Sequence, residues 1–371
     1  MTARATRMVS TMASAFIAAA ALTGCDFFSN ELEGLNGGKV SDEEFFSQIM
    51  AAKPDEATTF DPAERAGTGW LIEDPSTGKK AHIYSYDCEQ DKLEAYLGAP
   101  VSALTDEYRK LLGNMCIWHN KQTSIAWRKP ISYEVGGVPV FFMAHATIPT
   151  EETPTSIAFR HEEGHIISTL LGGKPEGMEI YVDEDNNSAW EEAMADAYAI
   201  LTVTRDTGSL YEGAWWWQRR LFTAMPHPDP QYVFPVNTTA GYFNPFVLEA
   251  AVHKAAELLE YGAIFSHSDI ELAKMARELT RENLMTVEEM QKFFRAQQSV
   301  VTYYLKRGFQ DPERNPELMI KYGGYTEDNP VFRQFRRAVG FFEYLEKQPQ
   351  APSPPSGVSF HQLGPLRHNV S

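Results

Sequence analysis

The chain has little positive charge, few cysteines and no internal repeat. Its 371 residues include 33 Lys and Arg against 50 Asp and Glu, which gives a formal net charge of −17. Because a protein that neutralises phosphates needs a basic face, this balance argues against a nucleic-acid-binding protein. The remaining composition is that of a folded protein, with 43% apolar and 22% charged residues. A chain of this length has room for one large domain or two modest ones.

The apolar run near the N-terminus is too short to span a membrane comfortably. It extends from Met8 to Leu22, follows two arginines and ends at Leu22-Thr23-Gly24-Cys25. A positive start before a short apolar run is typical of a secretory signal, and the last four residues resemble a bacterial lipobox. The alternative is an ordinary cleaved signal with an incidental cysteine. We expect residues 1–24 to be removed and Cys25 to carry a lipid.

The expected location follows from that lipid anchor. The mature protein would be attached to a membrane of the bacterial cell envelope, with its domain outside the cytoplasm, in the periplasm if the cell is Gram-negative. The protein would thus contact the membrane through its N-terminal lipid anchor. Asp26 resembles the residue that keeps some lipoproteins on the inner membrane, but this rule varies among bacteria and leaves inner and outer membrane open.

Cysteine is scarce in the rest of the chain. Only Cys88 and Cys116 remain after Cys25. In an oxidising compartment an even pair can close a disulfide, and two buried free thiols are the alternative. Because geometry decides between the two, the sequence leaves both open.

The pattern of turn, strand and helix signals changes along the mature chain. Residues 25–58 are expected to form a tether and a short helix, and residues 59–150 carry turn residues and short β-like runs. Helical signals dominate from 155 to 346, and the Pro-rich segment 347–371 is expected to be disordered. We therefore predict an α+β fold, with a small β-containing N-terminal part and a mainly helical C-terminal part.

Three later helices have recognisable first residues. Asn244-Pro245 and Asn329-Pro330 each open a helix, and Thr286-Val287-Glu288-Glu289 is a capping box before a helix that reaches about Lys306. The first of these helices carries an apolar stripe formed by Leu248, Ala251, Val252, Ala255 and Leu259.

One helix-compatible segment carries the residues of a metal site. In His161-Glu162-Glu163-Gly164-His165 the two histidines are four residues apart. At about 100° per residue they lie on one helix face, one turn apart, where both imidazoles can reach a single metal ion. Glu162 is placed to take a proton from water at that ion, as metal-assisted hydrolysis requires. Two solvated histidines, or two core histidines bonded to backbone carbonyls, are the alternatives.

A second helix supplies a candidate third ligand. Ser188-Ala189-Trp190-Glu191 is a capping box, in which Glu191 bonds back to the helix start. Glu192 is then left to face inward, and Asp196 follows four residues later on the same face. The neighbouring residues are mostly alanine, and carboxylates on such a face are costly to bury unless they bind a metal or accept hydrogen bonds. A solvated Glu/Asp face is the alternative.

Together the two motifs resemble those of the gluzincin zinc metallopeptidases, the clan that includes thermolysin. The resemblance covers roughly residues 138–205 and implies that His161, His165 and Glu192 bind one zinc ion per chain. It also implies that Glu162 is the general base and that Asp196 orients a ligand histidine. The interval of 27 residues between His165 and Glu192 is longer than in thermolysin but within the range of the clan.

The fold and function that the resemblance implies are those of a hydrolase. A zincin-like metallopeptidase core would form a single catalytic domain over 59–346, with a β-containing part at 59–150, the metal-site helices at 155–207 and a helical part at 208–346. The substrate would be an envelope peptide or protein. Two alternatives stay open: zinc hydrolysis of a non-peptide amide, and a catalytically silent lipoprotein that uses the fold for binding or scaffolding.

The apolar run before the metal helix is expected to be a strand. Gluzincins place a strand there, whose edge receives the substrate backbone. In residues 138–147, Phe141, Met143 and His145 alternate with Phe142, Ala144 and Ala146. We expect one set to face the helices and the other to face the cleft or solvent, with His145 at the surface or packed rather than in a subsite.

Other features are harder to place. The sequence has no recognisable transition-state histidine motif, so Tyr242, His227 and His253 are candidates by position alone, and His253 is expected to be solvated. Residues 183–187 are acidic but lack the pattern of a calcium loop. Among Trp215-Trp216-Trp217 we expect at least one core residue and others partly exposed, followed by a charged face at 218–220.

Overall fold

The computed structural model describes residues 41, 46–47, 49, 62–86, 91–106, 109–114, 125–131, 133–144, 155–175, 189–225, 243–307 and 316–347. The chain divides into two units, 1–47 and 48–371. In the first unit, the described residue Phe46 is helical and buried. All the elements below belong to the second unit. The predicted signal, Cys25, Cys88, Cys116 and the Pro-rich tail lie outside the described residues.

The second unit begins with a mixed sheet of five strands. They are β1 (Gly69–Asp74), β2 (Lys79–Ser85), β3 (Ile125–Ala126), β4 (Glu134–Val135) and β5 (Val138–Ala144). β1 and β2 pair antiparallel, and β2 pairs parallel with β5, with Ile83 opposite Phe141. β3 and β4 pair antiparallel with β5, so that β5 lies in the interior of the sheet.

The interior strand β5 is buried on both faces. Val140, Phe142 and Ala144 belong to an apolar cluster with residues from the segment 93–112. Phe141 and Met143 alternate with them and are buried too, on the face to which α5 (Thr155–Leu170) packs. The expectation that one set faces a cleft or solvent is therefore wrong over 140–144, because both faces of the sheet are covered there. With β3 and β4 alongside it, β5 offers no free edge to a substrate along this stretch.

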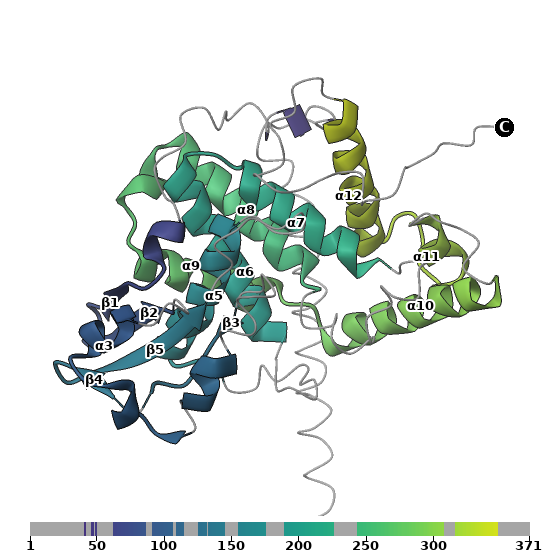
Figure 1. Ribbon diagram of the computed structural model, residues 1–371. Helices are drawn as coiled ribbons and strands as arrows, with labels where there is room; N and C mark the ends of the chain where they lie inside the picture. Colours follow the sequence, from purple (N-terminus) through teal and green to yellow (C-terminus); the bar gives the residue numbers. More distant parts are fainter. Residues whose placement is uncertain are drawn as a thin grey trace, which may run out of the picture. The chain divides into compact units, whose positions relative to one another are not determined.

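Helices make up most of the chain after the sheet, as Figure 1 shows. The first is α5, and it is followed by α6 (Ala189–Thr207), α7 (Tyr211–Ala224), α8 (Pro245–Glu260), α9 (Asp269–Asn283), α10 (Val287–Lys306), α11 (Glu317–Lys321) and α12 (Pro330–Lys347). A further helix, α3 (Asp91–Leu97), lies earlier in the chain, between β2 and β3. The predicted α+β class, with a β-containing N-terminal part and a mainly helical C-terminal part, is confirmed. None of the described helices is both long and apolar enough to cross a membrane.

The helix α6 is the centre of the helical part. It packs against α5, α7, α8 and α9, and every residue from Ala189 to Thr204 is buried except Glu191. Its contact with α5 is close because Gly164 meets Ala195: a Cβ atom on Gly164 would lie 3.0 Å from the Ala195 Cα. Small residues at this crossing bring the two helices that carry the sequence motifs together.

The three later helices begin where the sequence indicates. Asn244 precedes α8 with Pro245 at its start, and Thr286 forms a capping box with Glu289 at the start of α10. Asn329 accepts hydrogen bonds from the first backbone N–H groups of α12. The apolar stripe of α8 differs at one position, since Leu258 is buried and Leu259 only half-buried.

Candidate metal centre

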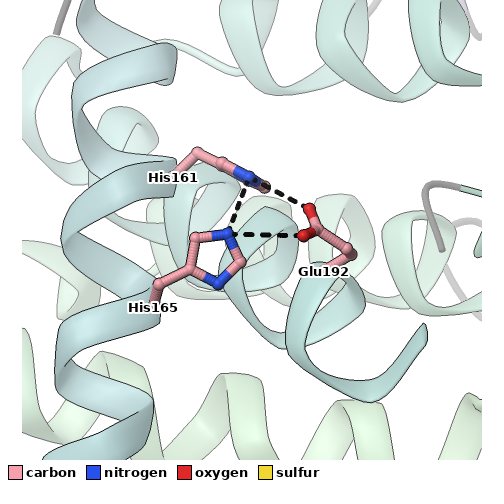
Figure 2. Close-up of side chains that lie close together, drawn as sticks. All are labelled: His161, His165 and Glu192. Carbon is pink, nitrogen blue, oxygen red and sulfur yellow. Dashed lines mark hydrogen bonds and ion pairs between the residues drawn. The ribbon is translucent and has the colours of Figure 1, made fainter. Parts of the chain in front are cut away.

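The structure brings His161 and His165 of α5 together with Glu192 of α6. The two Nε2 atoms of the histidines lie 3.2 Å apart. Glu192 places Oε2 at 3.3 Å from the Nε2 of His161 and Oε1 at 3.6 Å from the Nε2 of His165. All three residues are buried, and Figure 2 shows their donor atoms turned toward one another.

The donor atoms are close enough together to hold one zinc ion. Zinc bonds of 2.0–2.1 Å to nitrogen and oxygen at tetrahedral angles separate neighbouring donors by about 3.3 Å. The two histidine nitrogens, 3.2 Å apart, agree with this value. The distances of 3.3 and 3.6 Å run to the two different oxygens of Glu192, and one donor atom from each of the three residues can be chosen so that all lie within 4.8 Å of one another. Two imidazoles and a carboxylate are also the protein ligands of one class of catalytic zinc site. The residues present therefore fit a zinc ion.

The two histidines are in different electrostatic surroundings. Burial opposes a charge on His161, but the carboxylates of Asp196 and Glu192 outweigh it and raise its pKa to about 10. Burial lowers the pKa of His165 to about 3, and Glu192 offsets only part of this effect. Burial also opposes the charge of Glu192, yet the neighbouring His165 and His161 hold its pKa below the usual range. In the absence of a metal, a proton on His161 thus balances the carboxylates.

Asp196 lies behind the cluster and contacts His161 from the side away from Glu192. Its Oδ1 is 2.7 Å from the Nδ1 of His161. Trp216 donates its Nε1–H to the same carboxylate at 2.8 Å, and Arg220 donates from Nε at 3.0 Å and from Nη2 at 2.8 Å. Burial opposes the charge of Asp196, but Arg220 and His161 hold its pKa below the usual range.

The sequence did not indicate the two α7 residues that hold Asp196. All three tryptophans at 215–217 are buried, so the expectation of partly exposed rings is wrong. The expected charged face at 218–220 is wrong as well, because Gln218 is buried and Arg220 stacks over Trp216 while it binds Asp196. The reason is that α7 packs between α6 and α12 and so has partners on several faces. The sequence did contain one indication: Trp216 and Arg220 are four residues apart, so they lie one turn apart on the same face of a helix.

Glu162 is buried beside the cluster. Burial raises its pKa to about 7, while His161 acts in the opposite direction. A carboxyl group with this pKa can both accept and release a proton near neutral pH, which is the property required of a general base that later acts as an acid.

Its neighbour Glu163 belongs to a different network. The Glu163 carboxylate accepts hydrogen bonds from Trp70 of β1 at 3.0 Å, from Arg160 at 2.6 Å and from Tyr198 of α6 at 2.8 Å. Arg160 also donates to Asp206 near the end of α6. These contacts tie the back of α5 to the sheet and to α6, and they fix the rotation of α5 that turns His161 and His165 toward Glu192.

Glu191 forms an ion pair with Arg128, which follows β3. The same arginine places Nη2 at 3.6 Å from Oε1 of Glu192. Ser188, the other half of the predicted capping box, lies outside the described residues. Arg128 was not indicated by the sequence; it adds a positive charge at the sheet side of the cluster.

Of the remaining candidates only His253 is described. It is partly buried, and burial lowers its pKa to about 4, so the expectation of a solvated histidine is wrong. The reason is that side chains of α12 reach this face of α8, where Gln334 and Arg337 donate to Glu249 and Arg337 also opposes a charge on His253. Residues His145, His227, Tyr242 and 183–187 lie outside the described ranges.

Comparison of the chain with family models, with curated proteins and with solved structures found no match. The argument for a function therefore rests on the residues and their geometry.

Proposed function

We propose that this protein is a zinc-dependent metallopeptidase that hydrolyses peptide bonds. The observation that supports this most is the buried His161-His165-Glu192 cluster, whose donor atoms lie close enough together to hold one metal ion and are of the types that zinc binds. The group next to it, Glu162, has the burial and pKa of a general base. The resemblance of the two helical motifs to those of gluzincins points to the same reaction.

In this proposal the zinc ion and the side chains of the protein have separate tasks. Zinc, when bound, polarises a carbonyl group and makes water a stronger nucleophile. Glu162 takes the proton from the attacking water and passes it to the leaving amine. Asp196, held by Trp216 and Arg220, keeps the Nδ1–H of His161 oriented, so that Nε2 of His161 faces the metal.

The place of action in this proposal is the bacterial envelope. The lipobox-like Leu22-Thr23-Gly24-Cys25 supports export and lipid attachment at Cys25. The substrate is then a peptide or protein of that compartment.

The first test is the zinc content of the purified protein. We expect about one zinc per chain in the wild type and in Glu162→Gln, and little in Glu192→Gln. These two substitutions make the same chemical change at two buried carboxylates, so they separate a ligand from a base. Absence of zinc after incubation with the metal, or equal zinc in Glu192→Gln, would remove the proposed site.

The second test is hydrolysis of a mixture of unstructured peptides, followed by mass spectrometry. We expect cleavage by the zinc-loaded wild type, loss of cleavage on chelation and a decrease of about 10²- to 10⁴-fold in Glu162→Gln. Zinc binding without any cleavage in the wild type would instead favour the silent lipoprotein, for which the Glu162 carboxylate has no role.

A further inference from the structure

The side chain of Ser168 is an unexplained polar group on the metal-binding face of α5. It comes three residues after His165 and seven after His161, so it lies about 60° and about 20° from them around the helix. The residue is 2% exposed, and its hydroxyl has no hydrogen-bond partner among the described residues. A buried hydroxyl without a partner is unfavourable and calls for an explanation.

The usual explanation for a hydroxyl inside a helix does not apply to Ser168. Helical serines and threonines commonly donate to the backbone carbonyl four residues earlier. Thr169, the next residue, does this and donates to the carbonyl of His165 at 3.1 Å. Ser168 makes no such bond within the described part of the chain.

The second unexplained atom is the Nδ1 of His165. It too is buried and has no hydrogen-bond partner among the described residues. Figure 2 shows it on the side of the ring turned away from His161, where α5 continues into its next turn. The Nδ1 of His161 also lacks a well-formed hydrogen bond, but the carboxylate of Asp196 lies 2.7 Å from it, and the Nδ1 of His165 has no such carboxylate among the described residues.

We propose that Ser168 is the positioning residue for His165, and that its hydroxyl oxygen accepts the Nδ1–H proton through one water, since the two atoms form no direct hydrogen bond with each other. This inference rests on the proposed zinc site. A histidine that binds a metal through Nε2 carries its proton on Nδ1, and such a proton nearly always has an acceptor, which fixes the tautomer and the ring orientation. Side chains of a helix lean toward its N-terminus, so the Ser168 hydroxyl leans toward the turn of His165.

The test compares Ser168→Ala with Thr169→Val. Both remove one hydroxyl from the same turn of α5, but the Thr169 hydroxyl contacts only a backbone carbonyl in the described structure. We expect zinc dissociation constants, measured by competition with a chromophoric chelator, to rise about 10- to 100-fold in Ser168→Ala. Thr169→Val should stay within about threefold of the wild type.

A second readout reports on the ring itself. In the zinc-loaded protein labelled with ¹⁵N at histidine, two zinc-dependent Nδ1–H signals are expected. Ser168→Ala should shift one signal and speed its exchange with water, whereas Asp196→Asn should affect the other. A merely structural serine would move neither signal selectively.

The possible failures are distinguishable. If the wild type binds zinc and Ser168→Ala leaves both the affinity and the Nδ1–H signals unchanged, the role of Ser168 is refuted and the zinc site stands. If the wild type binds no zinc, the proposed function falls and this inference falls with it.

Discussion

Asp196 carries a negative charge in a fully buried position, where donors from two helices surround it. Two of these donors, Trp216 and Arg220, come from α7, and the ring of Trp216 lies 6.1 Å from that of His161. A buried carboxylate that loses its cationic partner is strongly unfavourable. The charge of Arg220 should therefore affect both stability and the orientation of His161.

We predict that Arg220→Gln weakens zinc binding about 10- to 100-fold and lowers the free energy of unfolding by up to about 3 kcal/mol. Arg220→Lys keeps the charge but loses the paired hydrogen bonds, so its zinc affinity and its free energy of unfolding should lie between those of the wild type and those of Arg220→Gln. Chelator competition and thermal unfolding measure these effects. Arg219→Gln is the matched control, because it removes the same charge about 100° away around α7; an equal loss in that variant would contradict the role of Arg220.

A proton on His161 leads to a prediction about pH. Because the pKa of the metal-free His161 is raised to about 10, the imidazole is protonated at pH 7 and must lose its proton when it binds a metal. We predict that zinc uptake at pH 7 releases about one proton, and that the apparent dissociation constant falls by about tenfold for each unit of rising pH between 6 and 8.

Calorimetry in buffers of different ionisation enthalpy measures the number of protons released. Asp196→Asn should release fewer protons, since it removes a carboxylate that raises the pKa of His161. Zinc binding that is independent of pH over this range would show that His161 is already neutral before the metal binds, and would contradict its raised pKa.

At the scale of elements, the crossing of α5 and α6 sets the separation of the ligands. A Cβ on Gly164 would meet the Ala195 Cα and the Tyr198 ring, each at 3.0 Å. We predict that Gly164→Ala pushes the helices apart, lowers the free energy of unfolding by about 1–3 kcal/mol and weakens zinc binding. Thermal unfolding and chelator competition on the same sample check both effects.

The control for this prediction is another helical glycine. Nothing lies within 4 Å of a Cβ built on Gly113, which is exposed. Gly113→Ala should stabilise the protein by about 0.5–1 kcal/mol, because alanine favours a helix. If Gly164→Ala is as stable as Gly113→Ala, then α5 and α6 can move apart without a loss of stability, and the prediction is wrong.

At the scale of the whole molecule, the packing of α12 on α8 predicts acid sensitivity. His253 has a pKa of about 4 in the folded protein, below the usual 6.5 of the unfolded chain, because burial and Arg337 oppose its charge. The unfolded state therefore takes up a proton first as the pH falls from 6.5 to 4, and stability is lost over that window. The loss amounts to up to about 3 kcal/mol.

Denaturant unfolding of the wild type and His253→Gln at several pH values isolates this contribution. Above pH 6.5 the pH dependence of the two proteins should be parallel, and between pH 6.5 and 4 the variant should lose less stability. If the free energy of unfolding falls equally steeply with pH in both proteins between pH 6.5 and 4, His253 is not a neutral, buried residue.

The sequence predicted those parts of the molecule that depend on local spacing. The four-residue interval of His161 and His165 places them on one face. The helix starts depend on residues at the start itself, which are Pro245 in α8 and the capping side chains of Thr286 and Asn329 in α10 and α12. The α+β class followed from the change in pattern along the chain. Such features need no knowledge of how the elements dock.

What the sequence did not predict depends on docking. Trp216 and Arg220 are 20 and 24 residues from Asp196, and nothing in the local pattern pairs them. The burial of β5 on both faces followed from elements on either side of the sheet, although its run of consecutive apolar residues, unlike strict alternation, is typical of a fully buried strand. The burial of His253 was not predicted because it depends on α12, whose Arg337 lies more than 80 residues later in the chain.

The three donors of the cluster come from two helices, and Glu192 follows His165 by 27 positions in the chain. A cation held by all three would close this stretch into a loop, as a covalent cross-link does, and would bind only the folded chain. Zinc would then act as a stabilising ligand by mass action. At a free concentration 100 times its dissociation constant it would add ~2.7 kcal/mol to the free energy of unfolding. The resistance of this protein to heat and to proteases would thus depend on how much zinc its surroundings supply.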